Sequence, residues 1–434
     1  MRRLPVPYMS QEAVSCYDSL NFGLCGLSCF GGLNVYAIGQ EEIDAVARVI
    51  RFGKLFRHAP GADSESNQFE LEWAQTIGVE RALMVTSGTA ALICGLAGMG
   101  VGPGDEVIVP AYTFMASAIA PLAVGAVPVI AEIDESLTLD PADAERKITP
   151  RTKAIMPVYM RGLPADLDAI LEVARRHNVA VIEDACQAVG GSYKGKRLGS
   201  HGETGAFSFN YYKNISCGEG GAVVTDDETV YQRALIFHDG GAAFRSNAAE
   251  MKIPFFAGMN FRTNEILAAI MRVQLTRLDD ILEALRAEKR FLVEELRDCA
   301  AFTLSPVRCV EGDCASSLAL LFDSPKEAEA FVAALKELGV GAMSPINSGR
   351  HVYSNWSPIL EKRGSHHERL NPYNYPDVKV EYAPDMCPRT LDILARTVDL
   401  STSPTRSKDE SAEVVKKVRQ AAEKIGRVSA ASGA

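Results

Sequence analysis

The feature that most constrains the fold is a regular alternation of short apolar runs with helical patterns. In chain order these are strand-like 82–85, strand-like 106–109, helical 112–123, strand-like 127–130, strand-like 154–158, helical 167–177 and strand-like 179–182. Strands that alternate with helices form βαβ units, which build a mostly parallel sheet with helices on both faces. Such sheets bind ligands at the carboxyl ends of their strands. We therefore predict an α/β fold and look for a site at that edge.

The pattern also divides the chain into units of unequal size. A long amphipathic helical pattern runs from Glu265 to about Cys299, and a helix of this kind connects two domains or forms a subunit face. The segments around it are strand-like 222–225, strand-like 318–322, helical 326–338, irregular 344–387 and helical 410–425. We predict an N-terminal segment 1–40, a large domain 41–285, a smaller C-terminal α/β domain 286–428 and a frayed tail 429–434.

Composition excludes several classes of protein. Of the 434 residues, 47% are hydrophobic, which fills a core and excludes a disordered chain. Basic and acidic residues are interspersed, without the basic stripe of a nucleic-acid-binding protein. The ten cysteines form no Cys-x-x-Cys pair and no cluster with histidine, so we expect neither a metal site nor a disulfide framework. Two uncharged stretches, 21–39 and 114–131, are rich in Gly or contain Pro, and we expect no membrane span and a cytoplasmic location.

Two charged residues stand out because of what surrounds them. Asp184 comes directly after an apolar strand-like run, where a carboxylate is costly unless a cation or a proton donor faces it; the alternative is a helix N-cap or a loop acid. Lys213 is flanked by aromatic residues and a glycine run. Burial of an amine there would lower its pKa towards the nucleophilic form, although most lysines are simply solvated.

Taken together, the motifs resemble a known family. An early Ser-Gly-Thr turn opens a helix, an Asp follows a strand, and a Ser-x-x-x-x-Lys segment leads into a glycine run. This combination resembles the DegT/DnrJ/EryC1/StrS family of aminotransferases that depend on pyridoxal 5′-phosphate (PLP), and it extends from about 41 to 290. The matching segments are 85–92 (VTSGTAAL), 102–110 (GPGDEVIVP), 112–114 (YTF), 183–188 (EDACQA), 207–209 (FSF), 213–214 (KN), 218–221 (GEGG) and 258–262 (GMNFR).

The resemblance implies PLP-dependent transferase fold type I: a large domain with a mostly parallel central sheet, followed by a smaller C-terminal α/β domain. It implies that Lys213 forms a Schiff base with PLP and moves a proton, and that Asp184 pairs with the pyridine nitrogen. Gly88 and Thr89 would hold the cofactor phosphate at a helix N-terminus, with Ser208 as a second contact. The simpler alternatives are a plain turn for Gly88 and a strand-end hydroxyl for Ser208.

Further positions are carried over from the family in the same way. Phe114 would stack on the PLP ring, with Tyr112 as the alternative, and Gln187 would lie near the hydroxyl side of the cofactor. Asn260 would reach the PLP phosphate of a neighbouring subunit, which predicts a homodimer with shared active sites. Arg262 would support that contact or bind a substrate carboxylate; alternatively, it is structural.

The resemblance is weakest where the acceptor substrate is chosen. Arg350, His351 and Tyr353 are candidate substrate contacts, with a surface loop as the alternative. The family's usual Val-His is replaced at 158–162 by VYMRG, and NYY precedes the lysine at 210–212. Both changes adjoin the expected site, so the resemblance does not extend to a standard nucleotide-sugar substrate.

These features predict an enzyme that moves an amino group from L-glutamate or L-glutamine to a keto-sugar, keto-cyclitol or related carbonyl compound, by a ping-pong cycle through Lys213. Such a reaction suits glycan precursors, secondary metabolism or antibiotic biosynthesis. The alternatives are elimination, decarboxylation or carbon–carbon coupling with PLP, and a catalytically idle protein of the same fold. A nucleotide-binding protein is disfavoured because neither G-x-G-x-x-G after the first strand nor G-x-x-x-x-G-K-[ST] occurs there.

Overall fold

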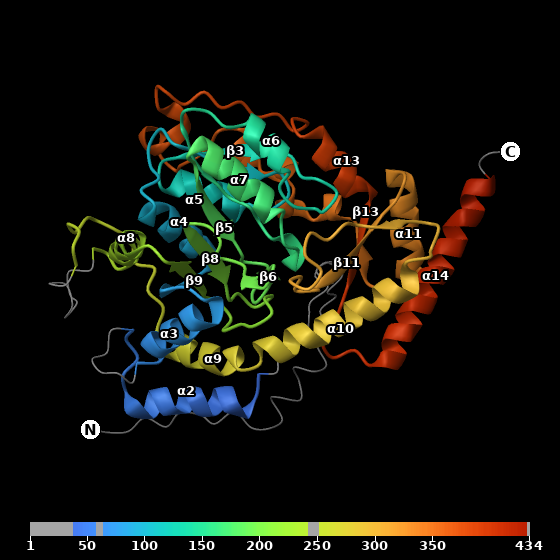
Figure 1. The fold of residues 1–434 in the computed structure, drawn as a ribbon, viewed down its shortest axis with the longest axis horizontal. Helices are drawn as coiled ribbons and strands as arrows, with labels where there is room; N and C mark the ends of the chain where they lie inside the picture. The colour runs from blue at the N-terminus through green and yellow to red at the C-terminus, as the bar shows by residue number, and fades with distance from the viewer. Residues whose placement is uncertain (1–37, 58–63, 242–250, 432–434) are drawn as a thin grey trace, which may run out of the picture.

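The computed structural model describes residues 38–57, 64–241 and 251–431 (Figure 1). Most of the predicted N-terminal segment and the uncharged stretch 21–39 therefore lie outside the described residues. Figure 1 shows a large sheet covered by helices and, beyond a long helix, a smaller sheet with helices of its own.

A seven-stranded sheet forms the centre of the molecule. Its strand order is β1-β9-β8-β5-β4-β2-β3, and within it only β9 runs against the other strands. The strands are β1 (Arg81–Val85), β2 (Glu106–Pro110), β3 (Val127–Ala131), β4 (Thr152–Ile155), β5 (Ala180–Asp184), β8 (Thr204–Ser208) and β9 (Gly221–Thr225). The predicted mostly parallel sheet is confirmed.

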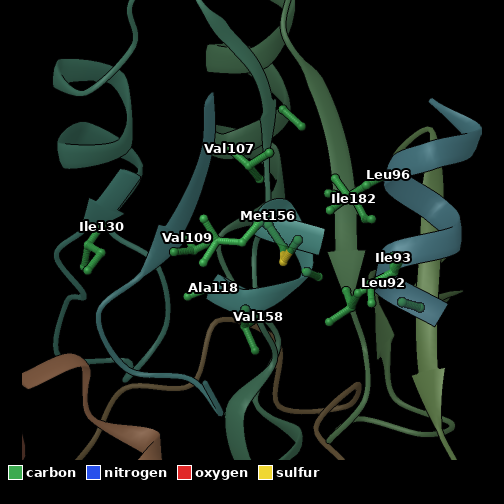
Figure 2. Packing of buried hydrophobic residues seen from close by; sticks show 14 of the residues in the cluster. Leu92, Ile93, Leu96, Val107, Val109, Ala118, Ile130, Met156, Val158 and Ile182 are labelled. Carbon is green, nitrogen blue, oxygen red and sulfur yellow. The ribbon is translucent and has the colours of Figure 1, made fainter. Parts of the chain in front are cut away.

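Both faces of this sheet are buried because apolar side chains alternate along its strands. Leu83 and Val85 of β1 face one core, and Ala82 and Met84 face the other. In Figure 2, Leu96 of α4 lies beside Ile182 of β5. The helices of the large unit are α2 (Gln40–Phe52), α3 (Glu65–Ile77), α4 (Gly88–Gly98), α5 (Ala116–Ala123), α6 (Pro141–Arg146), α7 (Leu167–His177), α8 (Glu228–His238) and α9 (Glu265–Leu275), and a small hairpin joins β6 (Ser192–Tyr193) to β7 (Lys196–Arg197).

One predicted helix begins later than expected. The sequence pattern predicts a helix over 112–123, whereas α5 begins only at Ala116. Tyr112 instead forms a bridge with Val352, and Thr113 donates its main-chain N–H to the His351 carbonyl at 2.9 Å. This pairing holds 112–113 outside the helix. The apolar spacing of a helix is a local pattern and does not reveal so distant a partner.

A second, antiparallel sheet of order β10-β11-β13-β12 forms the smaller unit. The long helix α10 (Leu278–Leu296) links the two units: Leu282 packs in the core of the large sheet and Leu292 in the core of the small one. The predicted domain boundary at 285/286 lies between these two residues. The elements of the smaller unit are β10 (Thr303–Leu304), β11 (Ser317–Leu321), α11 (Pro325–Glu337), β12 (Ala342–Met343), α13 (Pro388–Arg396), β13 (Thr397–Ser401) and α14 (Lys408–Ala431).

The predicted C-terminal domain does not pack as one body. Between β12 and β13 the chain returns to the large sheet, where Val352, Trp356 and Ile359 join the core of β2 and β4. The Tyr382 hydroxyl donates to the Pro128 carbonyl of edge strand β3 at 2.6 Å. The short elements here are 3-10 turns at Pro345–Asn347, Gly349–His351, Tyr353–Asn355, Glu368–Leu370 and Pro372–Asn374, and α12 (Ser357–Leu360).

The C-terminal helix extends further than predicted. Helix α14 continues to Ala431, three residues into the predicted tail. No helix in the part of the chain that the structure describes is long and apolar enough to cross a membrane.

Candidate active site

The candidate site lies where four parallel strands of the large sheet end. The carboxyl ends of β1, β2, β5 and β8 share one edge, and each leads into a predicted functional segment. Asp184 is the last residue of β5 and Ser208 the last of β8, while Gly88 follows β1 within three residues. The fold therefore brings together residues that lie 120 positions apart in the sequence.

The start of α4 forms a narrow turn against the ends of β5 and β8. The Ser87 side chain accepts a hydrogen bond from Ala90 N–H at 3.1 Å and so caps the helix. A Cβ added to Gly88 would lie 2.7 Å from Cys186 Sγ and 2.8 Å from Ser208 Cβ. Only glycine fits there. The free N–H groups of such a helix start, together with the Ser208 hydroxyl, are suited to bind an anionic group such as phosphate.

Asp184 is buried and held by two hydrogen bonds. Ser117 Oγ donates to its Oδ2 at 2.7 Å, and Cys186 N–H donates to its Oδ1 at 3.1 Å. Ser117 in turn shares a 2.6 Å hydrogen bond with Thr113 Oγ1, and both hydroxyls are buried. This small network fixes the direction of the carboxylate.

Lys213 lies on the loop that joins β8 to β9. The loop is closed by main-chain hydrogen bonds, among them Lys213 N–H to the Asn210 carbonyl at 3.0 Å. Burial lowers the pKa of the Lys213 amine, although Cys186, Asp184 and Glu219 counteract this by favouring the charged form. Burial beside Asp184 also raises the pKa of the Cys186 thiol well above its usual range. The lysine amine and the Asp184 carboxylate are thus close enough to interact.

Phe114 and His351 form one wall beside this pair. Their ring centroids lie 5.5 Å apart, and the Phe114 side chain is 42% exposed. Main-chain hydrogen bonds hold the two segments together, including Met115 N–H to the Arg350 carbonyl at 3.1 Å. Burial, together with the positive charges of Lys213 and Arg161, lowers the pKa of His351 to about 4. The imidazole is therefore neutral at physiological pH.

The structure places two predicted substrate residues in the core. Tyr112 is buried, and burial raises its pKa, with a further increase from Asp399. Tyr353 is buried as well; its hydroxyl donates to the Pro384 carbonyl and accepts from Cys387 N–H, each at 2.9 Å. The bridge between Tyr112 and Val352 brings the two segments together, and a substrate contact by either tyrosine stays a prediction. Arg350 is exposed.

The other predicted residues lie around the site or at its edge. Gln187 is partly buried, and its Oε1 accepts from Arg161 N–H at 3.2 Å. Thr89 is partly buried in the first turn of α4. Asn260 is exposed on a segment that passes the end of β1, and Arg262 pairs with Asp239 at 2.7 Å. The ion pair supports the structural alternative for Arg262.

Four residues of the site were not found from the sequence: Ser117, Thr113, Cys186 and Arg161. Ser117 left a signal, because it is a hydroxyl within an otherwise apolar run of small residues. Thr113, Cys186 and Arg161 lie in the segments 112–114, 183–188 and 158–162, which the sequence singles out without assigning these three residues a role. Of the three, Arg161 is the one whose side-chain partners, Ser317 and Asp399, come from distant segments. Among residues 38–57, 64–241 and 251–431, no group of His, Cys, Asp and Glu is arranged to hold a metal ion.

Comparisons with known proteins agree with this geometry. Residues 37–357 match the model of the DegT/DnrJ/EryC1/StrS aminotransferase family. The chain is 44% identical over 243 residues to a dTDP-3-amino-3,4,6-trideoxy-alpha-D-glucose transaminase from Streptomyces venezuelae, and 45% identical over 218 residues to a GDP-perosamine synthase from Caulobacter vibrioides. These matches cover 55% and 50% of this chain and 61% and 58% of the relatives, so the chain spans about three fifths of their length.

Solved structures of similar fold cover nearly the whole chain. A 3-amino-5-hydroxybenzoic acid synthase superimposes with a TM-score of 0.74 at 30% identity, covering 88% of this chain and 96% of the other. The S. venezuelae protein DesV, solved with a ketimine intermediate, gives a TM-score of 0.72 at 30% identity, covering 88% and 94%.

Proposed function

Because the chain belongs to the DegT/DnrJ/EryC1/StrS aminotransferase family, we propose that it binds PLP at the described sheet edge and transfers an amino group to a carbonyl substrate. One observation carries this proposal: an amine of lowered pKa, Lys213, lies within electrostatic reach of the buried Asp184. An activated amine beside a fixed carboxylate is the pair that PLP chemistry requires.

The residues present fit the cofactor. The turn at Gly88 has space only for a backbone without a side chain, which suits a phosphate bound by N–H groups and the Ser208 hydroxyl. Asp184, held by Ser117 and the Cys186 N–H, would accept a hydrogen bond from the ring nitrogen and keep it protonated. The exposed face of Phe114 is available to stack on the ring.

Bound PLP supplies an electron sink for the negative charge that forms when a substrate C–H bond breaks. Lys213 Nζ would attach the cofactor covalently and, once free, would move a proton to or from the substrate carbon. The neutral His351 ring lies against Phe114, and its Nδ1 faces the Ser348 carbonyl at 3.1 Å, so its Nε2 would be the nitrogen that accepts a hydrogen bond from the substrate.

We propose L-glutamate or L-glutamine as the donor and a keto-sugar, keto-cyclitol or related carbonyl compound as the acceptor. The named sugar transaminase and perosamine synthase support a sugar acceptor. A second candidate is the formation of an aromatic amino acid by elimination, which the structural similarity to 3-amino-5-hydroxybenzoic acid synthase supports.

We also propose a homodimer with shared sites. Large apolar side chains are exposed on two neighbouring segments, at Phe52 and Leu55 and at Phe255 and Met259. The segments are joined where Phe56 pairs with Asn264 and stacks under Arg262. Exposed apolar surface of this kind marks an interface, and Asn260 lies within it.

The test is an absorption spectrum of the purified protein before and after addition of each donor. We expect the visible band of lysine-bound PLP to convert into the near-ultraviolet band of the aminated cofactor with at least one donor. The Lys213→Ala variant should show neither band change. A visible band that neither donor alters would favour the elimination candidate, and absence of bound PLP would favour an idle protein.

A further inference from the structure

The turn after β4 has an unusual backbone. It spans Met160–Gly162, and Arg161 adopts left-handed geometry with φ 56° and ψ 23°. Gly162 follows with φ 81°, and a Cβ there would lie 2.5 Å from the Cβ of Cys314. Left-handed geometry is uncommon for a long side chain such as arginine, so the contacts around Arg161 must hold it.

On one side this turn is bonded to the segment that begins at Asp184. Arg161 N–H donates to Gln187 Oε1 at 3.2 Å, and Tyr159 N–H donates to the Asp184 carbonyl at 3.2 Å. Asp184 N–H donates in return to the Pro157 carbonyl at 2.9 Å. The turn therefore contacts Gln187, and the residues just before it contact Asp184.

On its other side the same turn is bonded to the smaller unit. Arg161 Nε donates to Ser317 Oγ of β11 at 2.9 Å and lies 3.0 Å from Asp399 Oδ2 of β13. The Arg161 carbonyl accepts from Ser316 Oγ, and Cys314 N–H donates to the Gly162 carbonyl at 3.1 Å.

The ion pair with Asp399 is protected from solvent. The Asp399 side chain is fully buried and that of Arg161 is 17% exposed. The Tyr112 hydroxyl lies beside the Arg161 guanidinium, and the Arg161 charge also reaches His351. Lys289 of α10 also acts electrostatically on Asp399, but the Arg161 charge has the larger effect. A buried carboxylate is costly without a cation, so the charge of Asp399 depends chiefly on Arg161.

From these contacts we infer that Arg161 is a positioning residue: through Asp399 and Ser317 it anchors the turn to the smaller unit, and through its main-chain N–H it orients Gln187 beside the cofactor. This inference rests on the proposed function, because Gln187 is expected to face PLP. Arg161 would thus act on the cofactor only through the Gln187 side chain. Cofactor binding would depend on the ion pair between Arg161 and Asp399 of the smaller unit.

The experiment compares Arg161→Asn and Asp399→Asn with the wild-type holoenzyme. Asparagine tolerates left-handed geometry, so the first variant removes the anchor without forcing the backbone to change. We expect PLP to dissociate about tenfold faster from each, because each variant breaks the ion pair that anchors the turn. We also expect the pH midpoint of the visible band to shift. Because the two residues act as one unit, the double variant should lose PLP no faster than the worse single variant.

Arg308→Gln is the matched control. Arg308 pairs with Asp134 and so also joins the smaller unit to the large one, but neither residue contacts Gln187. We expect its rate of PLP loss and its pH midpoint to equal those of the wild type. Thermal unfolding of every variant reports whether it is folded.

Each outcome decides a different question. Folded Arg161→Asn that keeps the wild-type rate and midpoint would overturn the inference, as would an equal effect of Arg308→Gln. A wild-type protein without a visible band would instead contradict the proposed function itself.

Discussion

The buried Ser117 hydroxyl orients the Asp184 carboxylate, because it donates a hydrogen bond to Asp184 Oδ2 at 2.7 Å. Replacement by alanine leaves one Asp184 oxygen without this partner. We predict that Ser117→Ala lowers the free energy of unfolding by about 1–3 kcal/mol and weakens PLP binding about tenfold. Denaturant titration and the rate of PLP loss measure the two effects.

Ser344→Ala is a suitable control for this prediction. Ser344 is also buried and donates to the Leu394 carbonyl at 3.1 Å, away from the site. Ser344→Ala should lower the free energy of unfolding by a similar amount and leave PLP binding unchanged. Equal PLP binding in Ser117→Ala and Ser344→Ala would show that the hydroxyl network is irrelevant to the cofactor.

His351 gives the second prediction at this scale. Its pKa is about 4 in the folded protein, below the ordinary value of 6.5 that the unfolded chain retains, so between these values the unfolded chain binds more protons. Stability therefore rises with pH across this window and is lost on acidification, by about 2–3 kcal/mol between pH 7 and pH 4.5. His351→Gln lacks this contribution. Urea unfolding at both pH values should show a smaller loss in the variant, and equal losses would refute the assignment.

At the scale of elements, the start of α4 depends on the absence of a side chain at Gly88. An added methyl group would lie within 2.8 Å of both Cys186 and Ser208, so the ends of β5 and β8 must move apart. We predict that Gly88→Ala destabilises the fold by about 1–3 kcal/mol and prevents tight PLP binding. Gly341→Ala, where nothing lies within 4 Å, should do neither. Tight PLP binding by Gly88→Ala would contradict the phosphate site.

The elements show what a sequence can and cannot predict. Helix α7 is predicted at 167–177 and spans Leu167–His177, because its apolar period and its Asp166 cap are local. The segment at Tyr112 is predicted as helix, yet it pairs with Val352, 240 positions away. For the same reason Lys213 and Asp184 can be found from their own neighbours, whereas Arg161 cannot, since Asp399 and Ser317 identify it only after folding.

At the scale of the whole molecule, the exposed apolar side chains predict self-association. We expect the wild-type protein to be a dimer in analytical ultracentrifugation. Phe52→Asp should raise the proportion of monomer, because it places a charge in the apolar surface. Val310→Asp is the control: its side chain is 63% exposed, close to the 64% of Phe52, but it lies in the smaller unit. A monomeric wild type would refute the shared site.

We propose that the Lys213 amine holds PLP at the sheet edge. The most direct measurement is reduction of the holoenzyme with borohydride, which makes the covalent link permanent, followed by mass spectrometry of its peptides. We predict a phosphopyridoxyl group on Lys213 and on no other lysine. A label on a different lysine, or no label on a protein that retains PLP, would contradict this role.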